Sequence, residues 1–200
     1  MIVLDVETTG IYPERNSLVS IGALDFYHPE DRFYEECQIW DGAEVTPEAL
    51  VVNGYTQEEI TDSSKQTEAE TVSNFFAWLR RKEDITVAGQ NCYMDVGFVE
   101  AAARRAGSKE RLPRRIFEQH SIVVFHMIKR GIAPPIKDRR SALDSDAIMA
   151  YVGIPAEPKP HIAINGAIWE YEALFRLIYE KPGLDDFRQF PIPWLSKAIL

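Results

Sequence analysis

The segment that most constrains the fold is an apolar run at the start of the chain, IVLDVETTG, which carries Asp5 and Glu7 near its end. Apolar and β-branched residues favour a buried strand, on which residues two apart point to the same face, about 6.5 Å from each other. Asp5 and Glu7 therefore share one face. Two neighbouring carboxylates repel each other, and burial raises their pKa values further. A hard divalent cation would remove both penalties, while a solvated strand end with two surface acids is the alternative.

The composition is that of an ordinary globular protein. The chain has 200 residues, of which 46% are hydrophobic and 26% charged. This size suits one α/β domain, which we place at residues 1–182, and we expect a tail over 183–200 to pack on that domain or on a partner. The net charge of −9 argues against a general nucleic-acid coat. It is compatible with an enzyme that meets phosphates through bound cations.

The sequence also bears on where the protein acts. No apolar run reaches the roughly 18 residues of a membrane span, and no basic stretch precedes the first apolar segment. We therefore expect a cytoplasmic protein with no membrane partner. Cys37 and Cys92 lack C-x-x-C spacing, which predicts buried free thiols and not a disulfide or zinc framework.

The first third of the chain predicts strands followed by short helices. Three segments rich in β-formers, MIVLDVE, LVSIGALDFY and RFYEECQIW, are separated by Gly, Pro and Asn, which predicts an antiparallel start. TPEALVVNG is typical of a short helix that ends at Gly54. Thr56 with Glu59, and Thr67 with Glu70, have capping-box spacing, and apolar residues at helical spacing follow the second box.

The rest of the chain alternates between strand and helix and then becomes mostly helical. ITVAGQN predicts a buried strand, and DVGFVEAAARRAG predicts a helix that stops at Gly107. This order favours a mixed sheet with helices on its faces. Helical patterns over 116–130, 144–152 and 163–179 are separated by GIAPPIKDRR and GIPAEPKP, which we expect to be loops within one domain.

A third acid, Asp95, follows the predicted strand and falls in the first turn of the next helix. The helix dipole stabilises a negative charge there and can direct it at a metal. An ordinary acid at a helix N-terminus would look the same.

In combination, three motifs resemble the DEDDh family of 3′–5′ exonucleases: DVETTG, NCYMD from Asn91 to Asp95, and His161 at the start of the last long helix. The resemblance runs from residue 2 to about residue 180. It implies a ribonuclease-H-like fold, with a mixed five-stranded sheet flanked by helices. It also implies a metal-dependent hydrolase that acts on phosphodiester bonds at nucleic-acid 3′ ends and releases nucleoside 5′-monophosphates.

The same resemblance implies cofactors, partners and residue roles. The implied cofactors are one or two Mg²⁺ or Mn²⁺ ions, and the implied partners are single-stranded DNA or RNA 3′ ends; a homodimer or a polymerase association is left open. The implied catalytic residues are Asp5, Glu7 and Asp95 as metal ligands and His161 as general base, and the implied substrate-binding residues are Thr8, Thr9 and Asn91.

The chain departs from the family pattern at one acid. That pattern has an Asp five residues after the His, but here His161 is followed at that position by Gly166. Glu170, one helical turn further along the same face, could supply the missing metal ligand, although an ordinary exposed helix acid would look the same. Asn165 or water could complete the metal shell instead. As an alternative function, the chain could be a catalytically impaired nucleic-acid-binding module. Glu172 points away from this face and is the weaker candidate.

Overall fold

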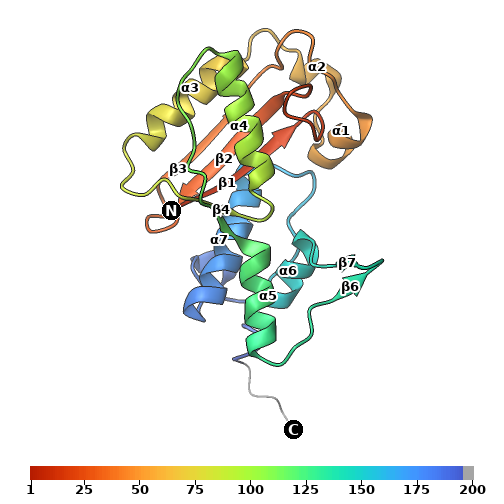
Figure 1. Cartoon of the computed structure of the whole chain (residues 1–200), viewed down its shortest axis with the longest axis vertical. Coiled ribbons are helices and arrows are strands. Elements are labelled where there is room, and N and C mark those ends of the chain that lie inside the picture. Colours follow the sequence, from red (N-terminus) through yellow and green to blue (C-terminus); the bar gives the residue numbers. More distant parts are fainter. Residues whose placement is uncertain (196–200) are drawn as a thin grey trace.

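A mixed five-stranded sheet forms the centre of the computed structural model, which describes residues 1–195 (Figure 1). Its strand order is β3-β2-β1-β4-β5, with β2 antiparallel to both of its neighbours, β1 and β3, and with β4 and β5 parallel to β1. The predicted mixed sheet with flanking helices is therefore confirmed. The strands are β1 (Ile2–Thr8), β2 (Leu18–Asp25), β3 (Arg32–Glu36), β4 (Val87–Gly89) and β5 (Phe117–Glu118).

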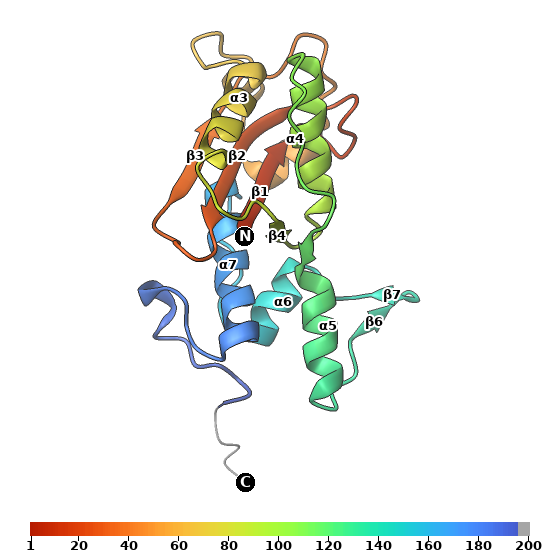
Figure 2. The same cartoon turned by 60° about the vertical axis from the view of Figure 1, so that its left-hand side comes forward.

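Two helices cover one face of the sheet: α3 (Glu68–Leu79) and α4 (Tyr93–Arg105) (Figure 2). Leu4 and Val6 of β1 point into the core that these helices close. The predicted capping box before α3 is confirmed, since Thr67 and Glu70 exchange hydrogen bonds between side chain and backbone.

The connection between β3 and α3 contains the two short helices that the sequence predicts. Helix α1 (Pro47–Asn53) ends at Gly54, whose φ of 73° is left-handed. Helix α2 (Gln57–Ile60) begins with the capping box of Thr56. Both predictions are confirmed.

The opposite face of the sheet is covered by α7 (Ala163–Tyr179), whose bounds agree with the predicted helix. Val3 of β1 packs with Ala167, Tyr171 and Leu174 of this helix. Gly22 of β2 allows the close approach, because a β-carbon there would overlap the backbone of Ala163. In the strand register Gly22 lies opposite Asp5. The first turn of α7 therefore lies directly over the position of the first predicted acid.

Below the sheet, α5 (Gln119–Lys129) and α6 (Ser145–Val152) pack on the C-terminal half of α7 around a second apolar core. Phe187 of a short 3-10 turn, η1 (Asp185–Phe187), and Trp194 also contact this core. The proposed division at residue 183 stays a prediction, and residues 196–200 of the expected tail lie outside the described part of the chain.

Two local predictions for this region are wrong. Residues 117 and 118, expected to be helical, form β5, because they pair with β4 before α5 begins. GIAPPIKDRR is not wholly irregular. It contributes to a small hairpin of β6 (Ile136–Lys137) and β7 (Arg140–Ser141), which turns at two residues with left-handed backbone, Asp138 and Arg139. Over residues 1–195, no helix is both long and apolar enough to cross a bilayer.

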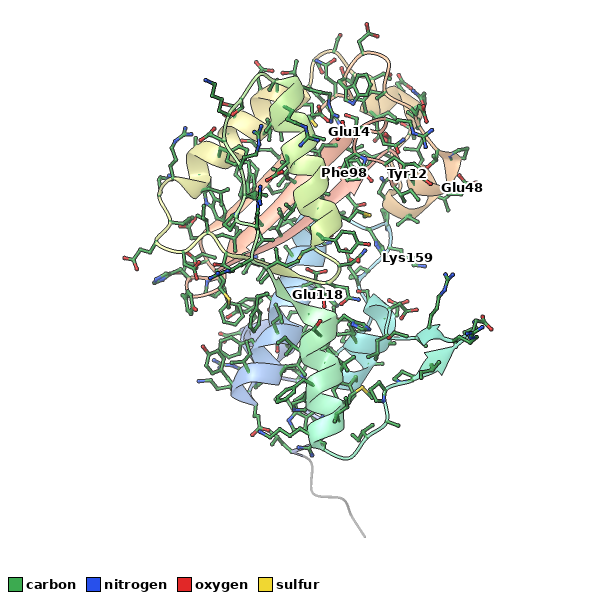
Figure 3. All side chains as sticks on the ribbon, viewed as in Figure 1. Tyr12, Glu14, Glu48, Phe98, Glu118 and Lys159 are labelled. Carbon is green, nitrogen blue, oxygen red and sulfur yellow. The ribbon has the colours of Figure 1, made fainter. Side chains whose placement is uncertain are left out.

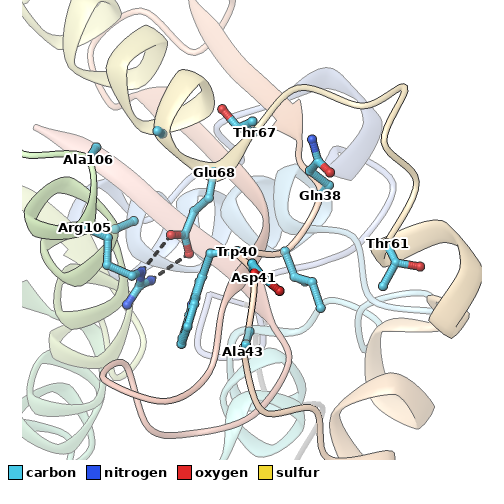
Figure 4. A pocket seen from close by; sticks show the side chains of 13 residues that line it. Gln38, Trp40, Asp41, Ala43, Thr61, Thr67, Glu68, Arg105 and Ala106 are labelled. Atoms are coloured by element: carbon cyan, nitrogen blue, oxygen red, sulfur yellow. Dashed lines mark hydrogen bonds and ion pairs between the residues drawn. The ribbon is translucent and has the colours of Figure 1, made fainter.

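A partly buried ion pair between Glu68 of α3 and Arg105 of α4 connects these two helices to the start of β2. The Arg105 guanidinium donates to both oxygens of Glu68, at 2.7 and 2.9 Å, beside a hollow of about 620 Å³ that Trp40 also lines (Figure 4). Glu68 also accepts hydrogen bonds from the Ser17 hydroxyl and the Leu18 N–H. Because the Ser17 N–H donates to Thr9, this network also fixes the chain just beyond β1.

Candidate active site

The site begins at the end of β1, where Asp5 and Glu7 lie on the face that points toward α7. Glu7 is buried and Asp5 is partly exposed. Between them, the Val6 N–H donates to Asp95 Oδ1 at 3.1 Å. Asp95 is buried in the first turn of α4, as the sequence predicts. One hydrogen bond therefore brings together acids that are about ninety residues apart in the sequence.

Gly166, at the position of the missing acid, lies against Asp5. A β-carbon at residue 166 would overlap Asp5 Oδ2. The side-chain volume that an acid would need at residue 166 is therefore taken by the Asp5 carboxylate. The glycine allows α7 and Asp5 to be in contact.

Glu170 extends from α7 into the same buried region. Its side chain is 7% exposed, so the interpretation as an ordinary exposed helix acid is wrong. Its Oε2 lies 2.6 Å from where a β-carbon on Gly89 would be, at the end of β4. Among the described residues this oxygen has no hydrogen-bond partner.

Glu172 is fully buried elsewhere and has a structural role. It pairs with Arg176 at 2.7 Å and accepts the N–H groups of Gly183 and Leu184. Arg176 donates in turn to backbone carbonyls of the segment after α7, including that of Phe187. The pair fastens this segment to α7, and Glu172 does not contribute to the acid cluster.

The gathered acids carry strongly raised pKa values. Burial raises the pKa of Asp5 well above its usual range, and the charges of Asp95 and Glu170 raise it further. Burial, followed by the charge of Glu157, raises the pKa of Glu7 to about 8. Burial raises the pKa of Asp95 to about 7 and that of Glu170 well above its usual range. No Lys or Arg among residues 1–195 forms an ion pair with any of these four acids.

This donor set suits a hard divalent cation. Carboxylate oxygens are the ligands that Mg²⁺ and Mn²⁺ prefer, and a cation would supply the partner that Glu170 Oε2 lacks. Within residues 1–195, no three Asp, Glu, His or Cys side chains already have their ligand atoms arranged to hold an ion. Asp5, Glu7, Asp95 and Glu170 are the residues that would hold it.

The predicted base, His161, lies one residue before the N-cap of α7. Its side chain is 30% exposed, and its Nδ1 lies 3.7 Å from Glu157 Oε2. Its backbone N–H donates to Val52 O at 3.2 Å. Glu157 in turn raises the pKa of Glu7. His161 is thus connected to the acid cluster through Glu157.

Sequence reasoning missed Glu157. It lies in the Pro-rich segment before α7, which we expected only to be a loop, and its side chain is 9% exposed. No periodicity applies to such a segment. Its position four residues before His161 was the available signal, but that spacing predicts contact only within a helix.

The predicted substrate-binding residues differ in their exposure. Thr9 is fully buried and its hydroxyl donates to Glu44 O, while the Thr8 hydroxyl donates to Gly10 O. Asn91 is exposed, with a left-handed φ of 59°, and its N–H donates to Glu118. Their contact with a nucleotide stays a prediction.

Aromatic side chains near the site also differ. Phe98 of α4 is fully buried, whereas Tyr12, in the segment after β1, is 53% exposed (both are labelled in Figure 3). Tyr93, at the start of α4, is 65% exposed. Phe98 is therefore excluded from stacking on a terminal base, and the two tyrosines are available for it.

Comparison with known proteins agrees with this arrangement. The family profile RNase_T, described as Exonuclease, matches residues 2–165. Ribonuclease T of Haemophilus influenzae (strain PittEE) is 27% identical over 122 residues, which cover 54% of this chain and 52% of that protein. The chain thus spans about half the length of the curated relatives it matches.

Solved structures show the same fold. Cell-death related nuclease 4 (CRN-4) superposes with a TM-score of 0.69 at 16% identity and covers 96% of this chain and 65% of its own. The zinc-bound form of the E. coli exonuclease I complex with single-stranded DNA has a TM-score of 0.69 at 14% identity, covering 90% of this chain and 41% of that one. The sheet order and these superpositions show a ribonuclease-H-like fold. Within that fold class, the chain belongs to the RNase_T exonuclease family.

The raised pKa values predict a pH dependence of stability in the metal-free protein. A carboxyl with a raised folded-state pKa contributes stability below its unfolded pKa, and this stability is lost as the pH rises through the folded value. For Glu7 this window runs from 4.5 to about 8. We expect the free energy of unfolding to fall by at least about 1.4 kcal/mol, one pKa unit, from pH 5 to pH 8.5. Urea denaturation in the presence of a chelator measures this free energy at each pH. Glu7→Gln should flatten the decline; a wild-type stability that rises over this window would contradict the prediction.

The contact between Gly166 and Asp5 predicts a specific sensitivity. Gly166→Ala displaces the Asp5 carboxylate, so we expect Mn²⁺ to bind at least about tenfold more weakly, a loss of about 1.4 kcal/mol. Isothermal titration calorimetry measures the affinity. Gly97→Ala in α4 is the matched control, because a β-carbon there meets only Pro13, at an ordinary 3.4 Å. Equal Mn²⁺ affinities of the two variants would show that Gly166 is not needed for this contact.

Proposed function

We propose that this chain is a metal-dependent 3′–5′ exonuclease, which hydrolyses phosphodiester bonds at nucleic-acid 3′ ends and releases nucleoside 5′-monophosphates. The observation that carries the proposal is the convergence of four acids without a protein cation: Asp5 and Glu7 from β1, Asp95 from α4 and Glu170 from α7. Family membership supports a hydrolytic activity of this kind.

The proposed cofactor is one or two Mg²⁺ or Mn²⁺ ions. When bound, such ions activate water and stabilise the charge that develops on the phosphate and on the leaving oxygen. Asp5 is central among the acids, since it is the residue on whose pKa Glu7, Asp95 and Glu170 all act. Glu170 fills the role of the acid that is missing at Gly166.

The chain's own residues then bind the strand end and move a proton. His161 accepts a proton from the attacking water, whose oxygen bonds to phosphorus while the bond from phosphorus to the 3′ oxygen of the preceding nucleotide breaks. Because Nδ1 lies near Glu157, Nε2 is the nitrogen that receives the proton. Tyr12 and Tyr93 are exposed surfaces on which the terminal bases can stack.

Single-stranded DNA and RNA 3′ ends are the proposed substrates. A relative named ribonuclease T and an exonuclease I solved with single-stranded DNA support the two kinds of nucleic acid. The two described cysteines, Cys37 and Cys92, are free thiols, which supports the cytoplasm as the proposed location.

A degradation assay tests the proposal. Single-stranded DNA and RNA with a 5′ label are incubated with the chain and Mg²⁺ or Mn²⁺. We expect stepwise shortening and release of nucleoside 5′-monophosphates, and a loss of at least about a hundredfold in rate with Asp5→Ala. Oligonucleotides that are bound but stay intact would contradict the proposal and favour the catalytically impaired binding module.

The different environments of Glu170 and Glu172 predict opposite phenotypes. Glu170→Gln removes an unpaired buried charge, so the metal-free protein should keep or gain stability while Mn²⁺ affinity falls at least about tenfold. Glu172→Gln leaves Arg176 buried with a weakened partner, so it should lower the free energy of unfolding by about 3 kcal/mol and leave Mn²⁺ affinity unchanged. Calorimetry and urea denaturation measure the two quantities. Loss of metal affinity only in Glu172→Gln would reverse the assignment.

A further inference from the structure

Glu157 is an almost buried acid with an unusual set of partners. Its side chain is 9% exposed, and within residues 1–195 its one ion-pair partner is His161. Lys159, two residues away in the same segment, does not pair with it. A carboxylate this well covered needs a partner to be stable in its charged form. The imidazole of His161 is the partner that the fold supplies.

The Glu157 carboxylate contacts two parts of the segment that starts α7. Oε2 lies 3.7 Å from His161 Nδ1, and Oε1 accepts the N–H of Ile162 at 3.4 Å. Ile162 is the N-cap residue of α7 and has no side-chain oxygen to cap the helix. Glu157 thus connects the imidazole to the first turn of the helix that carries Gly166 and Glu170.

The imidazole has a second anchor through its own backbone. The His161 N–H donates to Val52 O in α1. The main chain is thus held on α1, and because Nδ1 faces Glu157, Nε2 is the ring nitrogen left to accept a proton. A carboxylate on one ring nitrogen fixes the tautomer and makes the other nitrogen more basic.

Other charged groups near His161 are less well placed to hold its Nδ1. Asp144, Asp146 and Lys159 line the same hollow of about 290 Å³ as His161. Asp144 accepts the Ala147 N–H and caps α6, while Asp146 and Lys159 are exposed, so water screens their charges. Glu7 does not line this hollow, although the charge of Glu157 raises its pKa. Glu157 is the acid that the structure pairs with the ring.

We propose that Glu157 is a positioning residue, whose carboxylate holds His161 Nδ1 so that Nε2 faces the water that attacks the phosphodiester. The proposal rests on the proposed exonuclease function. In the step, the water proton moves to Nε2, the water oxygen bonds to phosphorus and the bond to the 3′ oxygen breaks. Glu157 stays ionised and stabilises the imidazolium that forms. Hydrogen bonds of this kind are often long without substrate and shorten in the complex.

The decisive measurement is the tautomer of the neutral His161 ring, read by NMR from its two ring nitrogen signals in the full, metal-free chain, with His161→Gln used to assign the signals. We expect the ring proton on Nδ1, facing Glu157, in the wild type, and largely on Nε2 in Glu157→Gln, because the carboxylate then no longer favours the proton on Nδ1. Asp146→Asn is the matched control, because it removes an exposed acid from the same hollow and should leave the tautomer unchanged. Equal effects of the two variants would overturn the proposal.

Kinetics and metal binding distinguish positioning from other roles. Glu157→Gln should lower kcat about 10- to 100-fold, leave KM unchanged and change Mn²⁺ affinity by less than about threefold, since it removes a charge near Glu7 but no metal ligand. Glu157→Asp should recover part of kcat. A fall of about tenfold or more in Mn²⁺ affinity with an unchanged His161 tautomer would overturn the proposal, because Glu157 would then be a metal ligand.

The tautomer measurement needs no substrate, so the two proposals can fail separately. An active wild-type enzyme whose His161 tautomer and kcat are unchanged by Glu157→Gln would overturn only the role of Glu157. A wild-type chain without nuclease activity would overturn the exonuclease function and, with it, the catalytic part of this inference.

Discussion

The close seating of α7 on the sheet is the contact on which the site depends. Two glycines make it possible: Gly22 lets the first turn of α7 approach β2, and Gly166 leaves the space that the Asp5 carboxylate fills. With α7 at this distance, Glu170 reaches the end of β4. A bulkier residue at Gly22 would lift the helix, and one at Gly166 would displace the Asp5 carboxylate. The geometry of the site is therefore set by backbone packing as much as by the acids themselves.

The gathered acids also explain why a cation belongs in this fold. Burial and mutual repulsion favour their protonated forms, and no lysine or arginine in the described chain offsets their charges. Elsewhere the protein does pair its buried acids: Glu68 with Arg105 and Glu172 with Arg176. The contrast separates acids that hold the fold together from acids kept for binding.

Much of the fold could be predicted from the sequence, because its signals are local. The apolar run around Asp5, the two capping boxes and the bounds of α7 depend on residues that are close together in the chain. The two-residue strand β5 and the small hairpin could not be predicted, since such short segments carry no periodicity. The burial of Glu170 and the contact of Glu157 with His161 depend on how distant elements pack. A sequence pattern does not show contacts between elements that are distant in the chain.

Helix α7 belongs to two apolar cores, one between it and the sheet and one that it forms with α5 and α6. Leu174 of α7 packs with β1 and β2, while Ala173 and Leu177 of the same helix pack with α5 and α6. Unfolding of the core that α7 forms with α5 and α6 would therefore remove part of the packing that holds α7, and would expose the sheet face that α7 covers. The elongated body in Figures 1 and 2 should thus behave as a single cooperative unit, in which thermal damage far from the acids still disperses them.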